Sequence, residues 1–161
     1  MRVVVVKDYK ELSFQAAQIV AGQIKRKCGS VLGLPTGQTP VGMYQELIER
    51  CRDGETDFSQ VITFNLDEYY GLNSDNPQSY HYFMQDKFFN RVNIKKENTY
   101  LLDGVTKDIE GECQRYEELI KTKGGIDLQV LGIGENGHIG FNEPATKLRS
   151  QTHLVNLSEE T

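Results

Sequence analysis

Short apolar runs recur along the chain at intervals that suit a parallel sheet. Buried parallel strands are typically continuous runs of valine, isoleucine and leucine, four to eight residues long. The run Val3–Val6 is β-branched throughout, and similar runs follow further along the chain. The predicted strands are Val3–Val6, Ser30–Leu34, Val61–Asn65, Asn98–Leu102, Asp127–Ile133 and His153–Leu157.

Helical spacing of apolar residues fills the stretches between these runs. Asp8 with Glu11 resembles a capping box, and Thr39 followed by Pro40 is typical of an N-cap and a first helical residue. The predicted helices cover about residues 8–28, 40–51, 78–91 and 109–123. The first of them would end at Gly29 and carry one apolar face of Leu12, Ala16, Ile19, Val20 and Ile24.

This alternation predicts an α/β fold, a Rossmann-like αβα sandwich whose doubly wound, mostly parallel sheet has helices on both faces. Neither repeats nor low-complexity linkers divide the chain, so we expect a single domain over residues 1–161. Ser158, Glu159 and Glu160 have the character of a helix start. We therefore expect the fold to be incomplete at its C-terminus. Ligands of such sheets bind at the carboxyl ends of the strands.

Composition narrows the class of protein. Hydrophobic residues make up 38% and charged residues 25% of the chain, which excludes disordered and membrane classes. The net charge of −5, without a dense basic stripe, argues against a nucleic-acid partner. Cys28, Cys51 and Cys113 form no CxxC pair, so a disulfide scaffold or zinc knuckle is not expected. With no signal peptide or membrane span recognised, we expect a cytoplasmic protein.

The loop after the second predicted strand contains Thr36, Gly37, Gln38 and Thr39 and leads into a helix. Such a turn points backbone N–H groups outward at the positive end of a helix, which suits a phosphate. It lacks the Gly-Lys-Ser/Thr ending of a Walker A loop. An ordinary βα turn with a threonine cap is the alternative.

The loop after the third predicted strand carries Asp67 and Glu68. A carboxylate that leaves an apolar strand is partly desolvated, which raises its pKa and makes it a better base. Either residue could instead cap the next element or pair with a cation, and the loop alone favours that alternative. The neighbouring aromatic residues are expected in the core: Tyr69, Tyr70, Tyr80, Tyr82, Phe83, Phe88 and Phe89.

The loop from Gly132 to Pro144 holds four glycines, His138 and Glu143. Histidine moves protons near neutral pH, and a carboxylate such as Glu143 can fix its tautomer. The glycines match G-x-G-x-x-G, but late in the chain and without an obvious helix after them, so we disfavour a dinucleotide site. A metal site is disfavoured too, since no second histidine stands at HxxxH spacing. His81 and His153 lack comparable neighbours.

Together the three loops indicate proton transfer on a phosphorylated small molecule. The segments 32–37, 63–69 and 137–144 resemble, in order and spacing, the signatures of glucosamine-6-phosphate deaminases, in the glucosamine/galactosamine-6-phosphate isomerase family. The resemblance extends from about Val3 to Leu157. It implies conversion of glucosamine 6-phosphate and water into fructose 6-phosphate and ammonia, in N-acetylglucosamine catabolism. It also implies no metal and no organic cofactor.

The resemblance further implies roles for individual residues. Asp67 would move the proton from C2 to C1, and His138 would open the sugar ring while Glu143 holds and charge-balances it. Some members have aspartate where this chain has Asn136, which we expect to orient His138 and to shift the pH profile. The expected substrate and phosphate contacts are Thr36, Gly37, Gln38, Thr39, Glu68 and Gly137. Basic residues that complete the family's phosphate site would lie beyond position 161.

Three other readings stay open at this stage. A 6-phosphogluconolactonase would share the fold and the phosphate loop, although the segments 67–69 and 141–144 favour the deaminase. A sugar-phosphate-sensing effector domain would need no catalysis, but no DNA-binding segment precedes Val3. The chain could also fold without turnover. The sequence leaves the choice between monomer and homo-oligomer undetermined.

Overall fold

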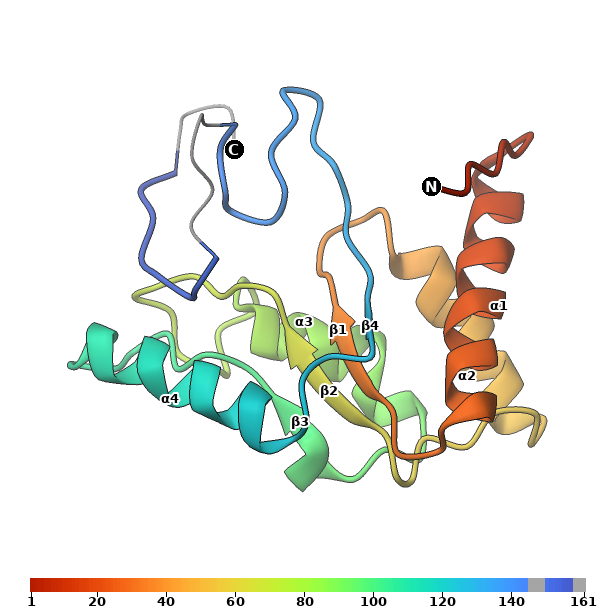
Figure 1. The fold of residues 1–161 in the computed structure, drawn as a ribbon, viewed down its shortest axis with the longest axis horizontal. Helices are drawn as coiled ribbons and strands as arrows, with labels where there is room; N and C mark the ends of the chain where they lie inside the picture. Colours follow the sequence, from red (N-terminus) through yellow and green to blue (C-terminus); the bar gives the residue numbers. More distant parts are fainter. Residues whose placement is uncertain (145–149, 158–161) are drawn as a thin grey trace.

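The computed structural model describes residues 1–144 and 150–157, and its centre is a parallel sheet of strand order β3-β2-β1-β4 (Figure 1). The strands are β1 (Val31–Leu34), β2 (Ile62–Asn65), β3 (Thr99–Tyr100) and β4 (Leu128–Gln129). The helices are α1 (Tyr9–Arg26), α2 (Val41–Arg52), α3 (Tyr80–Lys87) and α4 (Ile109–Thr122), with 3₁₀ turns η1 (Phe89–Arg91) and η2 (Lys96–Asn98). The predicted α/β class is confirmed.

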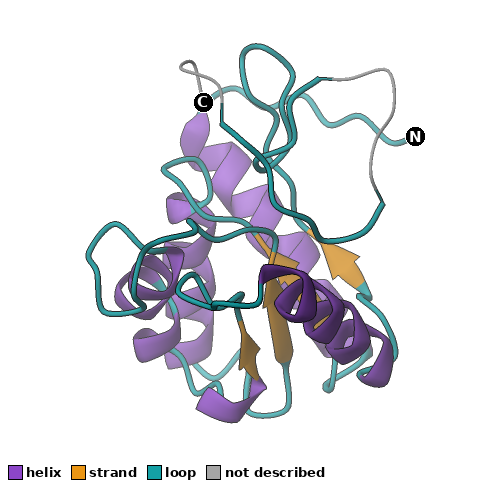
Figure 2. Cartoon of the chain, turned by 90° about the vertical axis from the view of Figure 1, so that its left-hand side faces the viewer, coloured by secondary structure: helices purple, strands orange, loops and turns teal. Residues whose placement is uncertain are grey.

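Helices cover both faces of the sheet (Figure 2) because alternate residues of each strand point to opposite sides. Leu32 and Leu34 of β1 join the larger cluster, with buried residues of α1, α2 and α3. Val31, which precedes Leu32 in β1, joins Phe64 and Tyr116 in a smaller cluster under α4. Two apolar layers therefore fix the sheet from either side and hold its carboxyl edge in place.

The N-cap of α1 comes from its own segment, whereas the N-cap of α2 depends on a distant residue. At α1 the predicted Asp8 cap is confirmed, since Asp8 accepts from the Glu11 N–H at 2.8 Å; the reciprocal bond of Glu11 differs from a regular capping box, because it accepts from the Lys7 N–H at 3.0 Å and not from that of Asp8. At α2 the predicted Thr39 cap is wrong, since Pro40 holds the N-cap position without a side-chain bond. The cap comes from α1, where the Tyr9 hydroxyl accepts from the Gly42 N–H at 2.9 Å.

Two predicted strands are wrong, and one predicted helix face is right at Val20 and Ile24 but wrong at Leu12 and Ile19. Val3–Val6 and His153–Leu157 are irregular, and Val5 is 91% exposed. A strand needs a hydrogen-bonding neighbour, and the described residues place none beside either run. On α1, Leu12 and Ile19 are exposed, because the buried stripe runs through Ser13, Ala17, Val20 and Ile24 instead. The predicted strand Asp127–Ile133 shortens to β4, and the chain then leaves the sheet.

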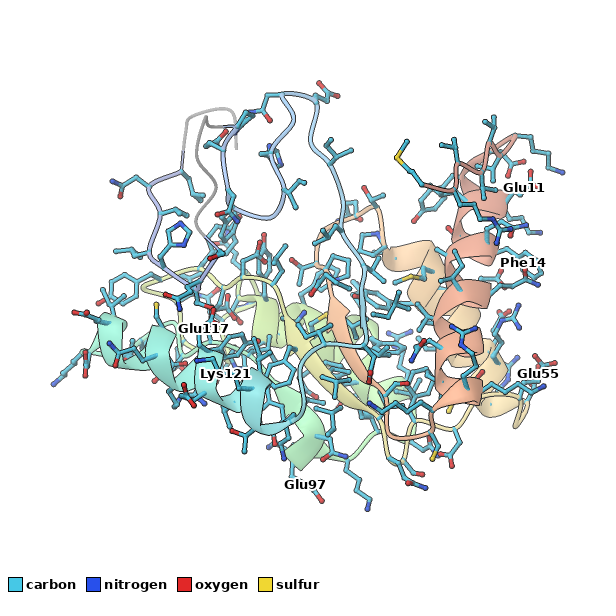
Figure 3. All side chains as sticks on the ribbon, in the orientation of Figure 1. Glu11, Phe14, Glu55, Glu97, Glu117 and Lys121 are labelled. Carbon is cyan, nitrogen blue, oxygen red and sulfur yellow. The ribbon has the colours of Figure 1, made fainter. Side chains whose placement is uncertain are left out.

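The segment 150–157 lies against α4 rather than in the sheet. The Thr152 N–H and hydroxyl both donate to Glu117 on α4, at 2.7 and 2.9 Å (Figure 3 labels Glu117). The predicted helix start at Ser158–Glu160 lies outside the described residues. Across residues 1–144 and 150–157, the structure contains no helix with the length and apolar character needed to cross a membrane.

Candidate active site

Three loops that leave the carboxyl edge of the sheet meet around one cavity of about 600 Å³. The loop after β1 contributes residues 36–39, the loop after β2 contributes Asp67, and the loop after β4 contributes His138. These are the segments that the strand-end rule singles out. The structure therefore brings together candidate residues that are about 100 positions apart in the sequence.

The first wall is the loop of residues 36–39, just before α2. Gly37 has a φ of 92°, a value that favours glycine and turns the backbone toward the cavity mouth. The Tyr9 hydroxyl contacts the carbonyls of Gln38 at 3.3 Å and Thr39 at 2.9 Å and holds them on the α1 side. In the described part of the chain, no hydrogen bond uses the N–H groups of residues 37–39. These donors suit an anion.

The second wall carries Asp67, two residues beyond the end of β2. Burial raises the pKa of this carboxyl from 3.8 to about 7, and the neighbouring Glu68 charge adds to the rise. The backbone of Gly140 packs against it, since a Cβ there would lie 2.9 Å from the Asp67 Oδ2. A carboxyl group with this pKa exchanges its proton near neutral pH, which is the property that a general base needs.

Glu68 points away from the cavity and is 1% exposed. Its carboxylate accepts from the N–H groups of Tyr69, Tyr80 and His81 at 2.8 to 2.9 Å, and it lies 2.8 Å from the His81 Nδ1. Of the two alternatives left open for this loop, capping of the next element applies to Glu68. The direct substrate contact implied by the resemblance does not fit this geometry, because α3 occupies both carboxylate oxygens.

The third wall presents His138 through a short chain of contacts. The His138 Nδ1 lies 2.7 Å from the Asn136 Oδ1, and the Asn136 Nδ2 donates to Glu143 at 3.2 Å. An amide oxygen only accepts, so Nδ1 carries the proton and Nε2 is left for chemistry. Asn136 therefore mediates between His138 and Glu143, where we expected Glu143 itself to hold the ring.

Glycines shape this third wall closely. The His138 ring packs on Gly134, since a Cβ there would lie 2.2 Å from the ring carbon Cε1. Gly137 has a φ of 92°, and its N–H donates to the Gly134 carbonyl at 2.9 Å. Its N–H is thus used to close the turn, which leaves Gly137 a shaping role and not the substrate contact expected for it.

Two aromatic residues that we expected in the core, Tyr69 and Tyr80, line the cavity, and Tyr80 also packs against the larger apolar cluster. Tyr69, Tyr80 and Phe141 form one cluster with ring centroids 4.9 to 5.6 Å apart. The Tyr80 hydroxyl interacts with the side chains of Tyr69 and Thr36, and burial raises its pKa. Phe88 and Phe89 are buried as predicted, whereas Tyr70 and Tyr82 are exposed. Tyr69 lies two residues after Asp67 in the sequence, and this closeness could have indicated that Tyr69 lines the site.

The site shows no arrangement suited to a metal ion. Within the described ranges, no group of three or more histidine, cysteine, aspartate and glutamate side chains could hold one. The cavity brings together the Asp67 carboxyl group, the His138 ring with its Nε2 available, and the backbone N–H groups of residues 37–39. The fold and the site thus define an α/β protein whose carboxyl sheet edge gathers a carboxyl group, a histidine and backbone donors around one cavity.

Comparison with known proteins gives the family. The family model described as glucosamine-6-phosphate isomerases/6-phosphogluconolactonase matches residues 7–157, and the chain belongs to this family. Glucosamine-6-phosphate deaminases of Thermoanaerobacter sp. (strain X514) and Halothermothrix orenii are each 59% identical to it over all 161 residues. The chain spans 64% of the length of the first and 67% of the second.

Solved structures agree with this assignment. A monomeric glucosamine-6-phosphate deaminase superimposes with a TM-score of 0.96 at 48% identity, covering 99% of this chain and 66% of that one. A 6-phosphogluconolactonase from Thermotoga maritima gives a TM-score of 0.73 at 25% identity, covering 86% of this chain and 63% of that one. The family recognised from the three loop segments is confirmed.

Proposed function

We propose that the protein is a glucosamine-6-phosphate deaminase, which converts glucosamine 6-phosphate and water into fructose 6-phosphate and ammonia. The observation that carries this proposal is the shared cavity of Asp67, His138 and the loop 36–39. Relatives that share 59% of their residues with this chain bear the same name. We further propose that residues 1–161 belong to one domain, since both apolar clusters pack on a single sheet.

The loop 36–39 would bind the phosphate through its free N–H groups and its threonine hydroxyls. His138 would open the pyranose ring by taking the proton of the anomeric hydroxyl at Nε2 and delivering it to the ring oxygen. The Asn136 contact supports this step because it fixes the proton on Nδ1, and Glu143 places its negative charge on the far side of Asn136. The sugar is then an open-chain amino aldehyde.

Asp67 would then remove the proton from C2 and return it to C1. During this transfer O1 gains a proton and the C2 nitrogen loses one, so the C1 aldehyde becomes a CH2OH group and the C2 amine becomes an imine. Water adds to C2, and ammonia leaves as the C2 carbonyl of fructose 6-phosphate forms. A pKa of about 7 supports Asp67 in this role, since a base near the working pH is both ionised and strong. Side chains and water suffice for every step, so we propose no cofactor.

A 6-phosphogluconolactonase is the second candidate, because the family includes both activities and one such enzyme shares the fold. Its reaction is hydrolysis of a lactone and requires no proton transfer between carbons. A carboxyl group whose pKa rises to about 7, in the same cavity as a histidine, suits carbon acid chemistry better. The greater identity with deaminases also favours the first candidate.

The test is ammonia release from glucosamine 6-phosphate by the full-length protein, compared with its Asp67→Asn variant. We expect turnover to fall by at least ~10³-fold in the variant, with binding of the sugar phosphate retained. Asp57→Asn is the matched control, since Asp57 lies on the surface loop before Phe58. Unchanged turnover in Asp67→Asn would remove the proposed base, and lactone hydrolysis without ammonia release would favour the second candidate.

A further inference from the structure

Glu68 is a buried carboxylate that the proposed chemistry does not use. It is next to Asp67 in the sequence, but its side chain is buried against the start of α3, where it accepts from the N–H groups of Tyr80 and His81. Burying a charged group is costly unless hydrogen bonds compensate. A serine or an asparagine could cap a helix at lower cost, so the charge itself calls for an explanation.

We infer that Glu68 is a positioning residue for the catalytic base: it anchors the start of α3, and Tyr80 with it, against the site, and it places a permanent negative charge beside Asp67. This inference rests on the proposed function, in which Asp67 is the base. The anchoring and the charge are separate effects, and different substitutions separate them.

The anchoring follows from the division of donors at the start of α3. Glu68 accepts from the N–H groups of Tyr80 and His81 at 2.9 Å, and Ser79 accepts from the N–H of Tyr82 at 3.1 Å. The first three N–H groups of the helix are thereby satisfied, and the carboxylate lies at the positive end of the helix. The Tyr80 side chain is then presented to Thr36 of the phosphate loop.

Glu68 stays ionised because its hydrogen bonds lower its pKa by more than burial raises it. Burial alone raises the pKa of Glu68, but the bonds from His81 and from the N–H groups of Tyr80, His81 and Tyr69 bring the net pKa below its ordinary value. Glu68 is therefore ionised wherever Asp67 titrates. Its charge disfavours a second negative charge on Asp67 and adds to the rise in the Asp67 pKa.

Other charged groups around Glu68 come from α3 and α4. From α3, His81 contacts the carboxylate at 2.8 Å. From α4, Glu112 interacts electrostatically with His81 and is itself paired with Arg115 through a 2.6 Å hydrogen bond. The tyrosines 69 and 80 complete the surroundings. Asp67 and His81 are therefore the titratable side chains closest to the charge of Glu68, since Asp67 is its neighbour in the sequence and His81 contacts it directly.

The experiment uses Glu68→Gln and Glu68→Asp in the full-length protein. Two quantities are measured: kcat/KM against pH, and the titration of the Asp67 carboxyl by carbon NMR, assigned with Asp67→Asn. We expect Glu68→Gln to move both the acid limb and the carboxyl titration to lower pH by roughly tenfold in proton concentration. Glu118→Gln is the control, since it removes the same charge from an exposed position on α4.

Glu68→Asp keeps the charge but is one methylene too short to reach the N–H groups of α3. We expect an unmoved acid limb with a several-fold higher KM, because Tyr80 is no longer held toward Thr36. A role in folding alone would move neither the limb nor the carboxyl titration. An unshifted Asp67 titration in a folded Glu68→Gln variant overturns the inference, and an unchanged KM in Glu68→Asp overturns the anchoring.

If Glu68→Gln does not fold, the same two measurements on His81→Leu decide the matter, since that change removes the side-chain contact that compensates the charge of Glu68 and leaves the charge itself. The acid limb should then move to higher pH, and an unmoved limb overturns the inference. If the parent protein itself releases no ammonia, the proposed function fails, yet the carboxyl titration still tests the charge of Glu68. The two failures are therefore distinguishable.

Discussion

Replacement of Asp67 by asparagine should stabilise the protein at neutral and alkaline pH, although it removes the base. The pKa of Asp67 is about 7 in the folded protein and about 3.8 in an unfolded chain. Between these values the unfolded chain loses its proton while the folded protein keeps it. Stability therefore falls as the pH rises from about 4 to 7 and is constant above that range.

The size of this effect follows from the difference in proton affinity. Each tenfold difference corresponds to ~1.4 kcal/mol, so ionised Asp67 destabilises the fold by about 4 kcal/mol above pH 7. At pH 5 most of this destabilisation is absent. The stabilisation by Asp67→Asn should then be larger at pH 8 than at pH 5 by about 2 to 3 kcal/mol.

Denaturant unfolding of both proteins at pH 5, 6, 7 and 8 measures the difference directly. Asp57→Asn is a control of opposite sign. Hydrogen bonds from Ser59 and Asn93 lower the pKa of Asp57, so its carboxylate stabilises the fold above the unfolded-state pKa. A stability difference for Asp67→Asn that stays constant from pH 5 to pH 8 would refute the assignment of a raised pKa to this residue.

Two further predictions concern the walls of the cavity. Tyr9→Phe removes the hydroxyl that contacts the Gln38 and Thr39 carbonyls and accepts from the Gly42 N–H. We expect a several-fold higher KM with little change in kcat. We also expect the free energy of unfolding to fall by roughly 1 to 2 kcal/mol. Steady-state kinetics with Tyr82→Phe as control check this, and an unchanged KM contradicts it. Asn136→Asp places a carboxylate 2.7 Å from the His138 ring, which favours the imidazolium and should move the corresponding limb of the pH–rate profile to higher pH. A profile that coincides with that of the parent would show that this position does not tune His138.

Features that depend on a few neighbouring residues could be predicted from the sequence. The Asp8 cap of α1 is an example, because Asp8 and Glu11 lie within one helical turn. The place of Asp67 and His138 at one edge of the sheet was also predictable. It requires only that the strands be parallel, and the alternation of strands and helices predicts that arrangement.

Contacts between distant segments could not be predicted in the same way. Tyr9 caps α2 from about 30 positions away, and Glu68 anchors α3 from 12 to 13 positions away. The local pattern predicted Thr39 as the cap of α2, and it could not take account of a partner that the fold brings in from elsewhere in the chain. The wrong strand at Val3–Val6 has a related cause, since an apolar pattern indicates a preference but does not supply a neighbouring strand.

The strand β4 consists of two residues, and its pairing with β1 joins Leu32 to Leu128 and Gly33 to Gln129. The loop that carries His138 continues directly from this short ladder. Local opening is easiest where few backbone bonds and little buried apolar surface must be given up. Amide hydrogens around β4 should therefore exchange faster than those of β1 and β2, so that the His138 wall separates from the sheet before the rest of the molecule unfolds.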